Sequence, residues 1–289
     1  MELRTDLALE KREVLGTNEI EGVESRHFAR GDVSFTEIRI LSAEGSEALG
    51  KPIGTYITAE IPRLMKNPIT DDEMIDSIAK QLATLLPQEG TVLVVGLGNT
   101  DITPDAVGPR AVSNVLATRH IDGELAKEVG LEGLRSVAGF VPGVLGRTGL
   151  EAAESVKGLV KAIAPCAVIA VDALAARRLS RLGTTVQISD IGIIPGSGVG
   201  NARKGITKET LGVPVISVGI PTVVDVGTLV RDLTGSEREI PDGDARDMII
   251  TPREIDLVIE RASELIGMSI NRALQPDISV EEMLLLVGN

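Results

Sequence analysis

The feature that most constrains the fold is an unbroken apolar run, Val92 to Val95, which leads into Gly96 and Gly98. The run is rich in β-branched residues and too short for a helix, which is typical of a strand buried on both faces of a sheet. Glycine at its end gives the backbone a freedom that no side chain would allow. Ligands collect at the carboxyl ends of strands in open α/β sheets, so we expect the polar loop that follows to carry the functional site.

The same Gly-x-Gly pair also raises the possibility of a dinucleotide site. The dinucleotide fingerprint needs a third glycine, but Asp101 occupies that position and would repel a pyrophosphate. A nucleotide-binding module built on Gly96 to Gly98 stays as a rival interpretation. A tight turn that merely carries polar residues is another.

Composition excludes several classes of partner. The formal charge of −13 argues against a broad nucleic-acid or anionic-membrane surface. With three Phe, one Tyr and no Trp, the core must be aliphatic, and aromatic platforms for base stacking are nearly excluded. No segment approaches the ~20 apolar residues of a membrane span, and the N-terminus has no apolar signal region. We therefore expect a soluble, cytoplasmic protein without nucleic-acid or membrane partners.

The pattern of elements predicts a single α/β domain. A second buried strand is expected from Cys166 to Val171. Because Cys166 is the only cysteine, no internal disulfide can form. Residues 1–31 read as an arm or loosely packed lead-in. The remaining expected strands are 32–41, 54–61, 184–188 and 213–218, and the expected helices are 71–86, 109–119, 150–163, 222–233, 252–274 and 279–287. We expect a three-layer fold, in which a sheet of mainly parallel strands is flanked by helices.

Carboxylates are the groups most suited to chemistry in this chain. The only histidines, His27 and His120, lack a metal-ligand spacing and a Ser-His-Asp context. Asp105 and Asp172 each follow a predicted buried strand, so both can face one crevice at the sheet edge. Two carboxylates in a partly dry crevice retain one proton between them, which provides a base for water and an acid for the leaving group.

Other polar residues remain as alternatives. Asp190 and Asp225 flank predicted strands and are secondary candidates, whereas Asp101 is interpreted as a local loop or capping residue. The glycine-rich loop from Pro195 to Lys204 matches neither a P-loop nor a Gly-x-Ser-x-Gly elbow. It is either a lip over a bound peptide or anion, or an ordered turn.

The chain resembles the germination proteases of endospore-forming bacteria. The matching stretches run in order through nearly the whole chain: RTDLA (4–8), VVGLGN and TPDAVGP (94–109), VPGVLGRTG (141–149), AVDALAAR (170–177), QISDIGIIPGSGVGN (187–201) and GIPTVVD (219–225). The resemblance implies an endopeptidase that degrades small acid-soluble spore proteins at germination. It also implies a homotetramer, made as an inactive zymogen in the forespore.

The resemblance also assigns residues. The two essential aspartates of the family fall on Asp105 and Asp172, and autoprocessing falls between Asp6 and Leu7. Residues 1–6 would then be a propeptide and residues 7–289 the catalytic domain. Cleavage after an acidic residue requires a positive pocket, for which the candidates are Arg177, Arg203 and Lys204. Asn99, Gly196 and Gly198 are further candidates for substrate binding.

The expected fold is similar to that of hydrogenase-maturation endopeptidases, which hold nickel with acidic residues and a histidine. Asn99 and Asp105 echo their Gly-Asn…acid motif, but we find no matching histidine. We therefore expect neither a metal nor a cofactor. A metal-dependent maturation-type endopeptidase remains the alternative, and a nonenzymatic scaffold that holds spore proteins is a further rival.

Overall fold

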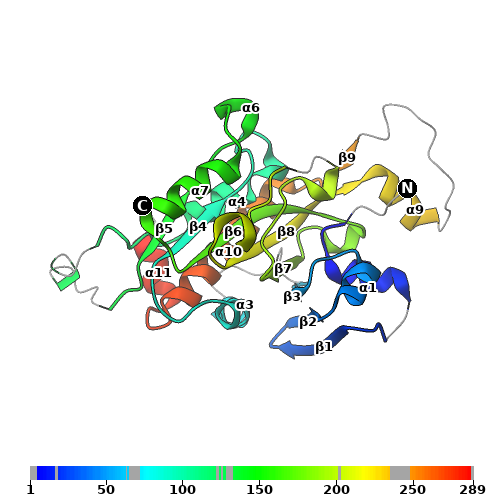
Figure 1. Cartoon of the computed structure of the whole chain (residues 1–289), viewed down its shortest axis with the longest axis horizontal. Helices are drawn as coiled ribbons and strands as arrows, with labels where there is room; N and C mark the ends of the chain where they lie inside the picture. Colours follow the sequence, from blue (N-terminus) through cyan, green and yellow to red (C-terminus); the bar gives the residue numbers. More distant parts are fainter. Residues whose placement is uncertain are drawn as a thin grey trace.

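The structure is a computed structural model that describes residues 5–16, 19–62, 64, 72–121, 124, 126–127, 133–200, 203–234 and 248–287. These residues form a nine-stranded sheet (Figure 1) with the order β1-β2-β3-β7-β8-β6-β4-β5, and β9 pairs with β8. The strands are β1 (Val23–Arg30), β2 (Val33–Ile40), β3 (Gly54–Glu60), β4 (Val92–Gly96), β5 (Val137–Phe140), β6 (Ala167–Ala176), β7 (Thr185–Ser189), β8 (Val215–Asp225) and β9 (Ile249–Ile250).

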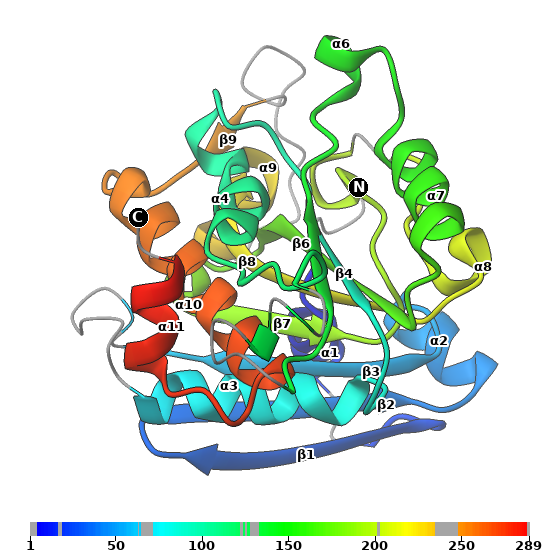
Figure 2. The same ribbon diagram turned by 90° about the vertical axis from the view of Figure 1, so that its left-hand side faces the viewer.

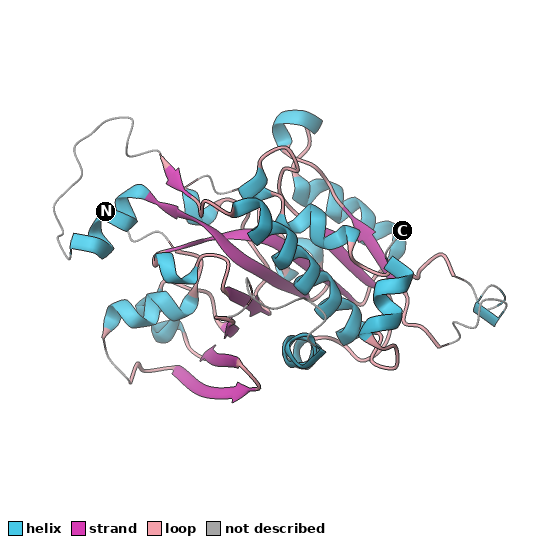
Figure 3. Ribbon diagram, turned by 180° about the vertical axis from the view of Figure 1, so that it is seen from behind, coloured by secondary structure: helices cyan, strands magenta, loops and turns pink. Residues whose placement is uncertain are grey.

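Helices cover both faces of the sheet, which confirms the α/β class. Figure 2 shows α4, α10 and α11 on one side of the central strands and α7 and α8 on the other. From behind, helices lie across the strands (Figure 3). The helices are α1 (Ala8–Leu15), α2 (Ala43–Leu49), α3 (Asp72–Leu85), α4 (Val107–Ser113), α6 (Leu145–Thr148), α7 (Ala152–Ile163), α8 (Lys208–Leu211), α9 (Val226–Thr234), α10 (Ile255–Leu274) and α11 (Val280–Val287), with 3-10 turns η1 (Thr103–Asp105), η2 (Leu179–Arg181) and η3 (Ser197–Val199).

The sheet has a parallel part and an antiparallel part. Strands β5, β4, β6 and β8 pair in parallel, as expected for strands connected by helices. Strands β7, β3, β2 and β1 extend the sheet antiparallel from β8. The parallel part carries the site predicted from the sequence, and the antiparallel extension supplies further contacts to it.

The run Val92 to Val95 is buried on both faces, as the pattern predicts. Val92 and Val94 pack into the core under α3, α4 and α10, whereas Leu93 and Val95 pack against α7 on the opposite face. Each of the four is at most 1% exposed. Because this strand is enclosed by two helical layers, its carboxyl end lies inside the molecule.

Several expectations about elements are wrong, among them the helix expected over 109–119, which is α4 and ends at Ser113. Residues 1–31 are not a loose lead-in over the described part, because Leu7 and Ala8 have no exposed surface and α1 and β1 lie in this range. Cys166 is half-buried and precedes β6 rather than lying within it. The segment 222–225, expected to be helical, continues β8 as far as Asp225, because its partner β6 also runs on and keeps pairing with it.

Among the described residues, we find no helix with the length and apolar character needed to cross a membrane.

Candidate active site

Asp105 is held by the turn that ends β4. The chain passes through Gly98, which has φ +117°, and a Cβ there would lie 1.9 Å from the carbonyl oxygen of Asp105. The backbone N–H of Asn99 donates a hydrogen bond of 2.8 Å to Oδ2 of Asp105. Glycine at position 98 therefore allows the loop to fold onto Asp105 and orient its carboxylate.

Asp172 lies within β6 and not after its end, which corrects the expected strand boundary. Its position is nevertheless special, because the pairing between β4 and β6 stops at Gly96 and Val171. The N–H of Ala173 donates a hydrogen bond of 2.9 Å to Oδ1 of Asp172, and Asp172 is only 6% exposed. Asp172 is thus the first residue of β6 beyond its pairing with β4.

Asp105 and Asp172 line the same cleft, which has a volume of about 560 Å³. Burial raises the pKa of Asp105, and the hydrogen bond from Asn99 partly opposes that shift. Burial, and then the charge of Asp105, raises the pKa of Asp172 well above its ordinary value of 3.8. The two carboxyl groups therefore disfavour simultaneous ionisation, so this arrangement can retain a proton at a pH where an exposed aspartate would have lost it.

The glycine-rich loop forms one wall of this cleft. Gly196, Ser197 and Gly198 line it, together with Asn99 from the loop that follows β4. The loop turns through Gly196, whose φ is +75°. The loop thus lines the cleft and also contains the ordered turn η3.

The expected positive pocket is only partly present. Arg203 and Lys204 line the cleft, but Lys204 pairs with Glu154 at 2.6 Å on the surface. Arg177 is not among the cleft-lining residues and instead forms an ion pair of 3.0 Å with Asp232. Of the three cations expected from the sequence, only Arg203 both lines the cleft and has no ion pair among the described contacts.

The predicted processing site lies in the cleft as well. Asp6 lines it beside the two other aspartates. The carbonyl oxygen of Asp6 accepts hydrogen bonds from Nζ of Lys51 at 2.9 Å and Nε2 of Gln187 at 3.0 Å. On the other side of this peptide bond, the N–H of Leu7 donates to the hydroxyl of Thr5 at 3.1 Å. Both ends of the Asp6–Leu7 peptide bond are thus fixed by hydrogen bonds.

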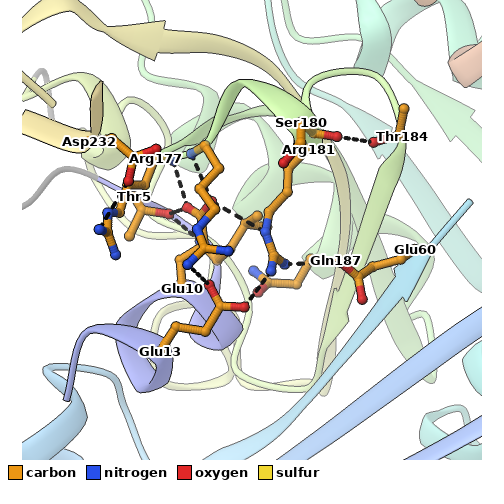
Figure 4. A network of polar contacts seen from close by, with 12 residues as sticks. Thr5, Glu10, Glu13, Glu60, Arg177, Ser180, Arg181, Thr184, Gln187 and Asp232 are labelled. Carbon is orange, nitrogen blue, oxygen red and sulfur yellow. Dashed lines mark hydrogen bonds and ion pairs between the residues drawn. The ribbon is translucent and has the colours of Figure 1, made fainter. Parts of the chain in front are cut away.

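A buried polar network anchors the segment that follows (Figure 4). Glu10 has no exposed surface, and its carboxylate accepts hydrogen bonds from the N–H groups of Arg177 and Arg178 at 2.6 and 2.9 Å. The hydroxyl of Thr5 also donates to Glu10. Arg181, 6% exposed at its side chain, lies 3.5 Å from Glu10. A buried carboxylate with this many partners holds α1 against the end of β6.

Sequence reasoning missed Lys51, Gln187 and Ser197 as site residues. Gln187 and Asp172 are both paired with Gly219, from opposite sides of β8. Side chains of paired residues share a face of a sheet, so this row places Gln187 on the face of Asp172. Lys51 carries no signal of its own, since it precedes β3 in a short loop.

The secondary candidates have structural positions outside the cleft. Asp190 accepts a hydrogen bond of 2.7 Å from the N–H of Thr55, and Asp225 accepts one of 3.0 Å from the N–H of Thr228 at the start of α9. Asp101 pairs with Arg147 on the exposed surface. Within the part of the chain that the structure describes, no group of three or more His, Cys, Asp or Glu side chains could hold a metal ion.

Comparison with known proteins gives consistent matches. The family described as "Germination protease" matches residues 2–235. The "Germination protease" of Caldanaerobacter subterraneus subsp. tengcongensis is 43% identical, with 97% of each chain covered. That of Clostridium tetani is 39% identical, with 98% of each covered, and that of Bacillus subtilis is 43% identical over 80% of this chain and 65% of its own. Among solved structures, the NiFe hydrogenase maturation protease HycI from Thermococcus kodakarensis matches with a TM-score of 0.35, 19% identity, and coverage of 66% of this chain and 98% of its own.

These sequence matches, together with the acidic cleft in the α/β fold, define the class of the protein: it is a peptidase. The residues that match the family, 2–235, include most of the described site, from the N-terminal segment through β8. The chain belongs to the germination protease family.

Proposed function

We propose that this chain is an endopeptidase that begins the degradation of small acid-soluble spore proteins during germination. Membership of the germination protease family supports a role in spore germination. The resemblance of the sequence motifs to that family supports the substrate, a homotetrameric assembly and a location in the forespore or spore core. The same resemblance supports synthesis as a zymogen, in which residues 1–6 are a propeptide and residues 7–289 form the catalytic domain.

In the proposed reaction, Asp105 and Asp172 activate water without a metal. Asp172 has the more strongly raised pKa, so it retains the shared proton and acts as the acid. Asp105, whose carboxylate is oriented by Asn99, acts as the base that takes a proton from water. The resulting hydroxide attacks the carbonyl carbon, Asp172 protonates the departing amine, and the peptide bond breaks.

The observation that carries this proposal is the hydrogen bonding of the Asp6–Leu7 bond beside the acidic cleft. Lys51 and Gln187 both donate to its carbonyl oxygen. Two donors on one carbonyl oxygen favour the negative charge that develops there during attack, as in an oxyanion hole. This bond matches the processing site of the family motif, and its surroundings support intramolecular cleavage between Asp6 and Leu7.

The proposal is tested by incubating the purified chain with a small acid-soluble spore protein, with and without a chelator. We expect cleavage that persists with chelator and is abolished in the Asp105→Asn and Asp172→Asn variants. The exposed Asp277→Asn variant is the matched control and should cleave normally. Cleavage that stops with chelator would instead support the metal-dependent alternative, and unchanged cleavage by an Asn variant at 105 or 172 would remove that residue from the mechanism.

A further inference from the structure

The carboxylate of Asp6 is bound by two neutral donors. Its Oδ2 accepts a hydrogen bond of 2.9 Å from the N–H of Ala175, and its Oδ1 accepts one of 3.1 Å from the hydroxyl of Ser197. Each carboxylate oxygen therefore has its own partner, one from β6 and one from the glycine-rich loop. Hydrogen bonds to an ionised carboxylate are stronger than those between neutral groups.

The N–H of Ala175 is available because β6 continues after β4 has ended. The last pair between these strands is Gly96 and Val171, so the described residues supply no strand beside this edge of β6 further on. Asp6 fills part of the edge, because its own N–H donates to the carbonyl oxygen of Ala175 at 3.0 Å. Asp6 thus binds Ala175 through both backbone and side chain, in the manner of a peptide added to a sheet edge.

Gly198 determines how much room the carboxylate has. A Cβ at position 198 would lie 2.0 Å from Oδ2 of Asp6 and 2.8 Å from the Cβ of Ala175. The left-handed backbone of Gly196 and Gly200 on either side of this turn brings Ser197 and Gly198 against the carboxylate. A side chain at position 198 would therefore displace either the loop or the bound acid.

A cation also lies near the bound acid. Lys51 donates to the carbonyl oxygen of the same residue. Burial lowers the pKa of Lys51, and the negative charge of Asp6 opposes that shift. The attraction between the two groups therefore partly offsets the cost of burying the lysine. The carboxylate is recognised by directed hydrogen bonds, and its charge is balanced by a lysine that binds the backbone.

We propose that the Ala175 N–H, the Ser197 hydroxyl and the open space at Gly198 form the subsite for an acidic side chain immediately before the cleaved bond. Asp6 occupies this subsite in the chain's own N-terminal segment, and an acidic residue of a protein substrate occupies it in turn. This inference rests on the proposed function, since it takes Asp6–Leu7 as a bond that the enzyme cuts. It names Ser197 and Gly198 as specificity-determining residues.

The test is a double-mutant cycle on processing of the full chain, followed by intact-mass measurement. In the wild-type background, Asp6→Asn should slow processing about tenfold, the effect of weakening charge-assisted hydrogen bonds. With Ser197→Ala, the same Asp6→Asn change should slow it only about threefold, because one donor to the acid is gone. Gly198→Ala should slow processing of both forms. Ser155→Ala and Gly158→Ala are the controls, since both lie on α7 and neither lines the cleft. In either background, Asp6→Asn should slow processing by the same factor as in the wild type.

A second measurement does not require cleavage. In an Asp172→Asn background, hydrogen exchange at the N–H of Ala175 should become about tenfold faster on Asp6→Ala, because its acceptor is removed. If Asp6→Asn slows processing by the same factor in the wild-type and Ser197→Ala chains, the proposed subsite is overturned and the proposed function is unaffected. Unchanged exchange at Ala175 would overturn it as well. Absence of processing and of substrate cleavage in the wild-type chain would instead overturn the proposed function.

Discussion

The ammonium group of Lys51 donates a hydrogen bond of 2.9 Å to the carbonyl oxygen of Asp6. In the proposed reaction this oxygen gains negative charge, so the Lys51→Met variant should process its N-terminus more slowly by about 10²–10³-fold. Processing is followed by mass spectrometry of the intact chain. The matched control is Lys80→Met, since Lys80 is 60% exposed on α3. A rate in Lys51→Met equal to that of the wild type would show that the lysine only anchors the segment.

Asp172→Asn should stabilise the folded protein near neutral pH. Burial and the charge of Asp105 raise the folded-state pKa of Asp172 well above 3.8, so the folded state binds this proton more tightly than the unfolded state. The free energy of unfolding of the wild type therefore falls as the pH rises from about 3.8 through the raised pKa. Because asparagine does not titrate, the free energy of unfolding of the variant does not fall for this reason.

The expected gain for Asp172→Asn at pH 7 is about 2–4 °C in Tm, and it should vanish at a pH below 3.8, the ordinary value of the group. Calorimetry at several pH values measures it, on chains with the same N-terminus. The control is Asp277→Asn at an exposed position. A gain of equal size at every pH would mean that the pKa of Asp172 does not carry the effect.

Arg181→Met should destabilise the protein by removing a buried cation. Arg181 lies 2.6 Å from Glu13 and 3.5 Å from Glu10, and Glu10 has no exposed surface. Leaving a buried carboxylate without its cation costs about 3–5 kcal/mol. Urea unfolding measures the change. Arg39→Met breaks the exposed pair with Glu24 and should change the stability by less than about 1 kcal/mol. Similar values for the two variants would contradict the importance of the buried network.

Gly98→Ala should reduce both cleavage and stability. Its φ of +117° strains any side chain, and the Cβ would lie 1.9 Å from the backbone oxygen of Asp105. The loop must then shift, which we expect to cost about 1–3 kcal/mol and to misplace Asp105. Thermal unfolding and the rate of substrate cleavage are the two measurements. Gly158→Ala, where a Cβ meets nothing within 4 Å, should leave cleavage unchanged and raise the stability by up to about 1 kcal/mol, because alanine replaces glycine within α7. Wild-type cleavage by Gly98→Ala would show that the turn does not position Asp105.

The sequence by itself determined the buried strand at Val92–Val95, the α/β class and the choice of Asp105 and Asp172. These follow from local patterns: a β-branched run with glycines at its end, and acids that come after such runs. The boundaries were less well predicted at β8 and β6, because each strand is prolonged by pairing with the other. That pairing is a long-range contact, which overrides the local preference for a turn or helix.

Only the tertiary structure decided which groups surround Asp6. Lys51 is 45 residues from Asp6 along the chain and Gln187 is 181 residues away, so no sequence spacing relates them. Gln187 reaches this place because β7 pairs antiparallel with β8, which places it across Gly219 from Asp172. Lys51 precedes β3, which pairs with β7. The positively charged residues chosen from the sequence were near the motif in the chain, but Arg177 and Lys204 pair with Asp232 and Glu154. The charge of a flexible side chain does not determine which partner it pairs with. The partner is determined by the packing of the strands and of the N-terminal segment.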